Sequence, residues 1–294
     1  MREAPIHQET TERQVHACVH GDRRPYVALY IGSSDPIGLL NGAVPRGERV
    51  TSVTGGCEYP IALLHNEPSS LHLFDVSPIA TAAAEVKLRC LRTLDRGDFE
   101  RTWTPAADTP LSRSAVFDRH VVPHLSPAAL AATEVLSDAE TMRRIGNDVA
   151  KRDRFAVPEL PGDGYERLQH IALCTDTRLS CANVLDLPAP IGEPHTLYIS
   201  NVGIIHDHTR GYAARLAQIG WQRVLFTTSD IAEDHFGSKV YTTSGGRWGK
   251  RPDMEYWTTV ESFYDCRYRV LGHEDADFPL LVECASAAEL RQST

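Results

Sequence analysis

The sequence lacks a long apolar run, an apolar leader and an excess of basic residues. No stretch approaches the roughly 18 apolar residues of a membrane-spanning helix, and the N-terminal segment MREAPIHQETTERQ is polar and mixed in charge. These absences predict a cytoplasmic protein without a membrane partner. With 30 Lys and Arg against 39 Asp and Glu, the formal net charge is −9, whereas nucleic-acid-binding surfaces need clustered basic side chains. We therefore expect a small-molecule substrate and no nucleic acid.

Closely paired cysteines are also missing. The seven cysteines are scattered singly, without the spacing of a zinc site or of a small disulfide framework. We expect most of them to be reduced, buried thiols. The segment His206-Asp207-His208 is rich in metal-binding side chains. Adjacent residues seldom converge on one ion, however, and Asp207 suits the cap of a helix that begins at Thr209. No metal is predicted.

The hydrophobic pattern alternates between short β-type runs and longer helical runs, which predicts a parallel sheet in an α/β domain. Expected strands cover residues 49–54, 70–74, 179–184, 195–200 and 223–228, and an edge hairpin covers 266–271 and 278–284. Expected helices begin at Tyr59, span Pro78 to Thr93 and span Arg210 to Ile219. Several prolines break the pattern between about 100 and 165. We therefore divide the chain into an N-terminal cap segment, 1–45, and a sheet domain, 46–294, with a helical insertion at about 100–165.

A pair of glycines, Gly55-Gly56, directly follows the first expected strand. In an open parallel sheet, ligands bind outside the carboxyl ends of the strands, and the first strand-turn-helix unit is the usual anchor. Glycine there permits positive φ and a close approach of the ligand to the backbone. The following helix offers free N–H groups to a carboxylate. A plain tight turn has the same sequence, so both interpretations stay open at this point.

Two carboxylates follow neighbouring strands of the expected sheet. Asp75 ends the second strand, at the separation from the glycine turn that is typical of a ribose-binding carboxylate; the alternative is a helix cap. Asp186 follows the next strand, where the adenine edge would lie, or it turns the chain before Pro188. The turn lacks the G-x-G-x-x-G spacing of dinucleotide folds. A nucleoside without phosphates therefore fits this edge better.

Three segments near the first two strands form a further pattern: Val53-Thr54-Gly55-Gly56-Cys57, Leu73-Phe74-Asp75-Val76-Ser77-Pro78 and Glu85-Val86-Lys87-Leu88-Arg89-Cys90-Leu91-Arg92. Together with Asp98-Phe99, Asp35-Pro36 and Tyr198-Ile199-Ser200-Asn201, they resemble the S-adenosylmethionine (SAM)-dependent 3-amino-3-carboxypropyl transferases of the betaine-lipid type. The resemblance covers about residues 30–100 and 183–230. Ser33 and Ser34 replace the family's tryptophan and glutamate, and Glu58 replaces its asparagine after Gly-Gly-Cys.

This resemblance implies a doubly wound, mostly parallel, seven-stranded sheet of the class I SAM-dependent methyltransferase type, with SAM as co-substrate. It also implies that a nucleophile attacks Cγ of SAM and releases methylthioadenosine. Shorter relatives act in specialised metabolism, including antibiotic biosynthesis: isonocardicin synthase alkylates a phenol, and azetidine-2-carboxylate synthases cyclise the aminobutyryl chain of SAM itself. We expect a phenol or amine acceptor. Self-cyclisation, methyl transfer and a nucleoside sensor without turnover are the alternatives.

The expected site combines these segments. We expect SAM to contact Asp35, Gly55, Gly56, Cys57, Asp75, Val76, Asp186 and Leu187, and the catalytic candidates are Tyr30, Ser200, Asn201 and Asp207. Ser200 and Asn201 end the fourth strand, where related transferases present polar groups to the transferred carbon. Tyr30 either folds over the site or packs as an ordinary aromatic residue. Asp207, or His206, would be the base for an acceptor hydroxyl, because removal of its proton makes the oxygen a stronger nucleophile.

Overall fold

The computed structural model describes residues 3–20, 40–103, 109–144, 164–189, 191–199, 219–221, 223–228, 258–259, 267–273 and 280–284. The elements in chain order are β1 (Ile6–Gln8), α1 (Glu12–His20), β2 (Arg49–Val53), α2 (Glu58–Leu64), β3 (Ser70–Asp75), α3 (Pro78–Thr93), α4 (Arg96–Trp103), α5 (Ala115–His120), η2 (Val122–His124), α6 (Pro127–Ser137), α7 (Ala139–Arg144), α8 (Gly164–Cys174), β4 (Asp176–Cys181), η4 (Val184–Asp186), β5 (His195–Ile199), β6 (Arg223–Thr228), β7 (Thr258–Thr259), β8 (Arg267–His273) and β9 (Leu280–Cys284).

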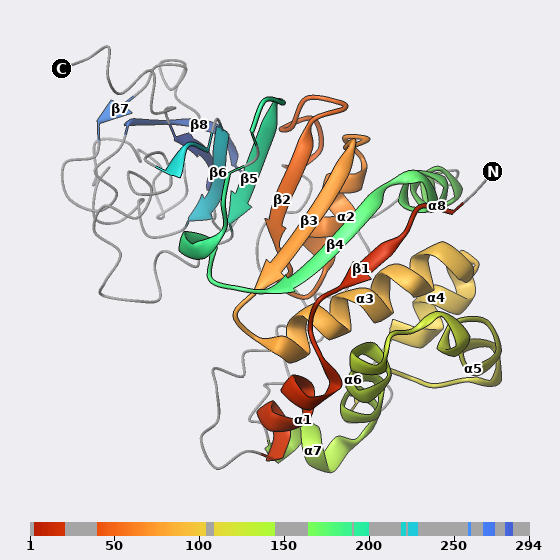
Figure 1. Cartoon of the computed structure of the whole chain (residues 1–294). Coiled ribbons are helices and arrows are strands. Elements are labelled where there is room, and N and C mark those ends of the chain that lie inside the picture. The colour runs from red at the N-terminus through yellow and green to blue at the C-terminus, as the bar shows by residue number, and fades with distance from the viewer. Residues whose placement is uncertain are drawn as a thin grey trace, which may run out of the picture.

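The strands form one nine-stranded sheet in the order β1-β4-β3-β2-β5-β6-β9-β8-β7 (Figure 1). The neighbours from β1 to β6 are parallel, and β9 is antiparallel to β6 and to β8. When the edge strands β1 and β7 are left out and β2 is counted as the first strand, the remaining strands lie in the order 3-2-1-4-5-7-6 across the sheet. This is the order of the class I SAM-dependent methyltransferase fold and confirms the predicted fold class. The strands β1 and β7 extend the sheet at its two edges, and β8 and β9 form the predicted hairpin.

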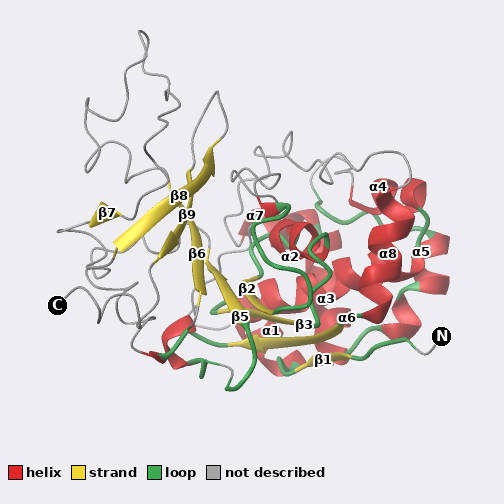
Figure 2. Cartoon of the chain, turned by 90° about the horizontal axis from the view of Figure 1, so that it is seen from above, coloured by secondary structure: helices red, strands yellow, loops and turns green. Residues whose placement is uncertain are grey.

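The central strands are buried on both faces. Every residue of β5 is buried, and so is every residue of β2 except Arg49, as expected for parallel strands covered by other elements. The helices α2 and α3 pack on β2, β3 and β4, and α8 packs on both helices. They lie together on one face of the sheet (Figure 2).

The long helix α3 has the bounds that the sequence predicts, Pro78–Thr93. Its N-cap is Ser77, whose side chain accepts a hydrogen bond from the Ala80 N–H, and Pro78 occupies the first position, where its missing N–H leaves no bond unmade. The helix ends where Leu94 becomes extended. Because most of its side chains are buried, α3 holds several other segments in place.

One of these segments is the helical stretch that follows α3. The carboxylate of Glu85, which is 1% exposed, accepts a bond from the Ser126 N–H at 3.0 Å and from the Ser126 hydroxyl at 2.7 Å. Ser126 is also the N-cap of α6. A buried carboxylate on α3 therefore satisfies the start of α6 and docks that helix on the sheet domain.

One central strand begins earlier in the chain than the sequence predicts. The strand β4 spans Asp176–Cys181 instead of 179–184, so the expected bounds are wrong. Exposed Asp176 and Arg178 alternate with buried Thr177 and Leu179, and these charged residues hid the strand in the hydrophobic pattern. After Cys181 the chain turns into η4, where the Asn183 side chain accepts a bond from the Leu185 N–H.

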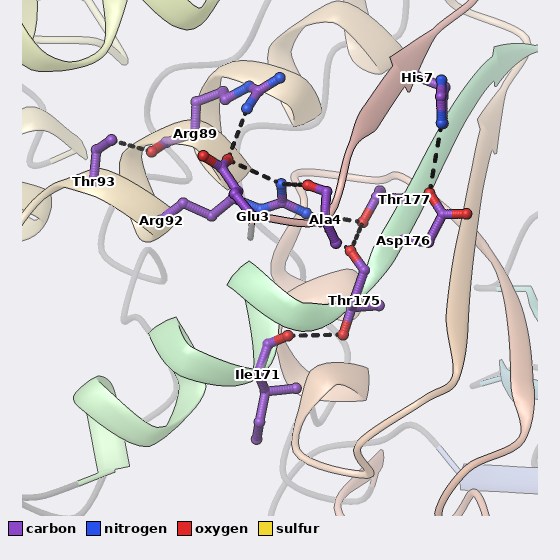
Figure 3. Close-up of polar contacts among 10 residues, drawn as sticks. All are labelled: Glu3, Ala4, His7, Arg89, Arg92, Thr93, Ile171, Thr175, Asp176 and Thr177. Atoms are coloured by element: carbon purple, nitrogen blue, oxygen red, sulfur yellow. Dashed lines mark hydrogen bonds and ion pairs between the residues drawn. The ribbon is translucent and has the colours of Figure 1, made fainter. Parts of the chain in front are cut away.

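No strand is expected near the N-terminus from the hydrophobic pattern, yet Ile6–Gln8 forms β1 beside β4. The side chain of Arg92, only 1% exposed, explains how this segment is held (Figure 3). Its guanidinium donates to the Ala4 carbonyl at 2.6 Å and the Thr175 carbonyl at 3.0 Å, and it pairs with Glu3 at 3.2 Å. Arg92 thus joins α3, β1 and the turn before β4.

We predict that Arg92→Met lowers the free energy of unfolding by about 3 kcal/mol, because the buried Thr175 carbonyl and the partly buried Ala4 carbonyl lose their donor. Arg89→Met is the matched control, since the Arg89 guanidinium pairs with the same Glu3 at 3.0 Å, a contact between two side chains. That variant should lose about 1 kcal/mol or less. Urea unfolding followed by circular dichroism measures both, and equal losses would contradict the role given to Arg92.

Candidate functional site

The turn between β2 and α2 is sharply bent. Gly55 has φ +49° and Cys57 has φ 71° and ψ 5°, so two residues of the Gly-Gly-Cys turn are left-handed. A Cβ on Gly55 would lie 2.5 Å from Cε2 of Tyr59, so no larger side chain fits. Tyr59 packs in turn on Tyr198 of β5, with ring centroids 5.2 Å apart. The turn therefore depends on glycine at position 55, for its φ and for its space.

Asp75 lies at the end of β3 and joins the ends of three strands. The Thr54 hydroxyl, at the end of β2, donates to Oδ2 at 2.7 Å, and the Ser77 N–H donates to Oδ1 at 3.0 Å. The Asp75 carbonyl accepts from the Ala182 N–H at 2.9 Å, just after β4. The backbone amides of Gly55 and Val76 also lower the pKa of this carboxyl, against the effect of burial. Because Ser77 caps α3, the alternative interpretation of Asp75 as the helix cap is wrong.

Asp75 is 9% exposed, and this burial dominates its chemistry. It raises the pKa of Asp75 to about 6, because the lost hydration outweighs the hydrogen bonds that favour the ionised form. The carboxylate is therefore largely ionised near pH 7 and becomes protonated in mild acid. A perturbed carboxyl at the carboxyl edge of a parallel sheet is a feature of ligand sites.

The other described residues expected to contact the nucleoside are Val76, which directly follows Asp75 in the chain, and Asp186 and Leu187, which come after β4. Val76 is 44% exposed, an unusual position for a large apolar side chain beside a buried charge. The Cys181 thiol donates to the Val76 carbonyl at 3.5 Å, so the end of β4 lies against this turn. Asp186 is exposed in η4, and Leu187 behind it is 7% exposed. The chain turn here is capped by Asn183, and no described contact gives Asp186 that role.

The remaining candidates fall outside the described residues: Tyr30, Asp35, Ser200, Asn201 and Asp207. The strand β5 is described up to Ile199, the residue before Ser200. The roles of these five residues remain predictions from the sequence.

The cysteine of the turn is not a nucleophile. Burial raises the pKa of Cys57 to about 12, so the thiol stays protonated at neutral pH. It donates to the Ala84 carbonyl of α3 at 3.7 Å. Burial, which the sequence predicts for most of the seven cysteines, is confirmed for three of the five that the structure describes: Cys18, Cys57 and Cys90 are buried, Cys181 is partly buried and Cys174 is exposed.

Sequence reasoning missed an ion pair beneath the turn. Lys87 Nζ donates to the Gly56 carbonyl at 2.9 Å and to the Glu58 carboxylate. The two side chains are 8% and 3% exposed, and Nζ lies 5.1 Å from the ring centroid of Trp103 on α4. The signal available in the sequence was a lysine between two apolar residues, Val86 and Leu88, because a charge that is buried with its neighbours needs a partner.

Known proteins add little to this geometry. No family model and no curated protein matches the sequence. Among solved structures, the chain is similar to the rRNA methyltransferase aviRa from Streptomyces viridochromogenes, with 13% identity, 91% of this chain and 93% of that chain covered, and a TM-score of 0.38. Similarity at this level is no evidence of a shared activity.

Within the ranges given above, no three His, Cys, Asp or Glu side chains are grouped as they would be around a metal ion. No helix in the described part of the chain is long and apolar enough to cross a membrane.

The raised pKa of Asp75 has a measurable consequence for stability. Because the folded protein holds this proton more tightly than the unfolded chain, the stabilising contribution is complete below about pH 3.8 and is lost as the pH rises through about 6. We predict that wild type loses up to about 3 kcal/mol relative to Asp75→Asn over this range. Subtracting the unfolding free energies of the two proteins at each pH isolates Asp75. A difference that does not change with pH would show that its pKa is not raised.

Proposed function

We propose that the protein binds SAM at the carboxyl edge of β2, β3 and β4 and transfers a group from it to a small molecule. The observation that carries this proposal is the Asp75 carboxylate, which lies at the end of β3 and is bonded to the glycine turn after β2 through Thr54. An ionised carboxylate has acceptor capacity for the two hydroxyls of a ribose. In doubly wound sheets, an acidic residue in this position holds the ribose of a nucleotide.

The neighbouring residues support a nucleoside in this place. The exposed side chain of Val76 offers an apolar surface next to the ribose position, where the flat face of adenine would be shielded from water. Leu187 and the exposed Asp186 follow β4, the next strand along the sheet, and we assign them to the adenine edge. The Gly55-Gly56 turn lets the rest of SAM approach the backbone.

We propose further that the transferred group is 3-amino-3-carboxypropyl. The support is the sequence resemblance, whose three main segments converge in one place. Thr54 of the first segment bonds to Asp75 of the second, and Lys87 of the third bonds to Gly56 of the first. Residues that are scattered over the sequence between Val53 and Arg92 thus surround a single turn.

In this reaction the lone pair of a phenol oxygen or an amine forms a bond to Cγ of SAM. The Cγ–S bond breaks, its electrons neutralise the sulfonium, and methylthioadenosine leaves. We assign the alignment of the nucleophile to Ser200 and Asn201, after β5, and removal of its proton to Asp207. Tyr30 and Asp35 would hold the aminocarboxypropyl arm from the N-terminal segment. Positioning carries most of the catalysis, because the sulfonium already activates the carbon.

The two enzymatic alternatives differ in their products. Attack by the amine of SAM on its own Cγ would give azetidine-2-carboxylate and methylthioadenosine. Attack on the methyl group would give S-adenosylhomocysteine.

The decisive experiment is to incubate the purified protein with SAM alone and then with phenolic and amine acceptors, and to separate the products by mass spectrometry. Methylthioadenosine together with an aminocarboxypropylated acceptor supports the proposal. Azetidine-2-carboxylate without an acceptor identifies the cyclase, and S-adenosylhomocysteine identifies a methyltransferase, so either result overturns aminocarboxypropyl transfer. Failure to bind SAM in equilibrium dialysis overturns the proposal as a whole.

We predict that Asp75→Asn weakens methylthioadenosine binding by about 10- to 100-fold, because a bond to a charged acceptor is lost. Methylthioadenosine is the suitable ligand, since it carries the nucleoside and neither the amine nor the carboxylate of SAM. Asp176→Asn is the control: Asp176 begins β4 at the opposite edge of the sheet and contacts His7 at 3.7 Å. Isothermal titration calorimetry measures both variants. Equal affinities for Asp75→Asn and wild type would remove Asp75 from the site.

A further inference from the structure

The buried pair of Lys87 and Glu58 has no part in the chemistry proposed above. A lysine on α3 that is 6% exposed loses most of its hydration, and such burial is costly unless the charge is paired. Glu58 supplies the pairing charge, and the Trp103 ring covers the ammonium. The remaining contact of Nζ is the carbonyl of Gly56, in the centre of the glycine turn.

This contact completes the fixation of a single peptide group. The peptide between Gly56 and Cys57 has its N–H bonded to the Thr54 carbonyl at 2.7 Å and its carbonyl bonded to Lys87 at 2.9 Å. Both polar atoms are therefore held, and the peptide cannot rotate without breaking two hydrogen bonds. The restraint acts next to Cys57, whose left-handed φ of 71° is unfavourable for a residue with a side chain.

We propose that Lys87 is a positioning residue: by holding the Gly56–Cys57 peptide, it fixes the shape of the glycine turn against which the aminocarboxypropyl arm of SAM lies. This inference rests on the proposed function, because it names the part of SAM that the turn contacts. The nucleoside depends on Asp75 and Val76, which have their own hydrogen bonds and are not held by Lys87. Loss of Lys87 should therefore weaken SAM much more than methylthioadenosine.

Three variants separate this role from simple charge balance. Lys87→Met alone leaves the Glu58 charge buried without a partner, so instability is expected and the variant is uninformative by itself. The double variant Glu58→Met/Lys87→Met replaces the pair with apolar side chains of similar volume, which proteins often tolerate. Glu58→Gln is the matched control, since it keeps the Lys87 bond to Gly56. Because it leaves the buried ammonium without its counter-charge, its folding is checked by circular dichroism before the affinities are compared.

We expect the double variant to bind methylthioadenosine within about twofold of wild type and SAM about tenfold or more weakly. The control Glu58→Gln should keep both affinities within about threefold. Unchanged SAM affinity in the double variant would overturn the inference. So would an equal loss for both ligands, because it would show a general disturbance of the site.

A second measurement does not depend on SAM. Hydrogen–deuterium exchange of peptides spanning residues 54–58 reports the Cys57 N–H, which is bonded to Thr54. In the ligand-free double variant this amide should exchange about tenfold faster or more than in wild type. Unchanged exchange overturns the positioning role even if SAM binds. If wild type binds neither SAM nor methylthioadenosine, the proposed function is wrong whatever the exchange shows.

Discussion

The carboxylate of Asp75 is the constraint around which the carboxyl edge of the sheet is arranged. It accepts the Thr54 hydroxyl after β2 and the Ser77 N–H before α3, and its own carbonyl accepts the Ala182 N–H after β4. A buried carboxylate without the Thr54 and Ser77 donors would be strongly unfavourable, so the Thr54 hydroxyl ties the end of β2 to the end of β3. The bond from Ala182 to the Asp75 backbone carbonyl adds the end of β4. Burial raises the pKa of Asp75 to about 6, so the group is largely ionised at neutral pH and becomes protonated in mild acid.

The helix α3 organises the rest of the molecule through three buried charged side chains, each satisfied by a different segment. Glu85 receives the start of α6, Lys87 holds the glycine turn, and Arg92 holds the N-terminal strand and the turn before β4. Charges inside a helix that packs on a sheet are costly, and each requires partners with the right geometry. These partners come from distant parts of the chain. The three residues therefore act as fixed points that bring the N-terminus, the inserted helices and the proposed SAM turn into one arrangement.

The proposed chemistry asks little covalent work of the protein. The sulfonium of SAM supplies the leaving group, so the chain must hold the nucleoside, extend the arm and align a nucleophile with the Cγ–S bond. The described residues divide the first two tasks: Asp75 and Val76 form the proposed nucleoside contacts, and the peptide held by Lys87 forms the proposed contact to the arm. This division explains why methylthioadenosine and SAM are the informative pair of ligands.

Local signals in the sequence were sufficient for a parallel sheet in an α/β domain, the bounds of α3, the glycine turn and the place of Asp75 at the end of β3, because periodicity, turn residues and caps act over a few neighbouring positions. They failed for β4, where the charged and exposed Asp176 and Arg178 interrupt the run of apolar residues. They also failed for β1, whose three residues are too few to give a pattern. Tertiary structure alone decided that Glu58, seen in the sequence as a departure from a family motif, is the partner of Lys87. It also decided that Asp75 is buried while Val76 beside it is exposed. Burial and charge pairing depend on which distant parts of the chain contact a side chain. A local pattern of residues does not encode these contacts.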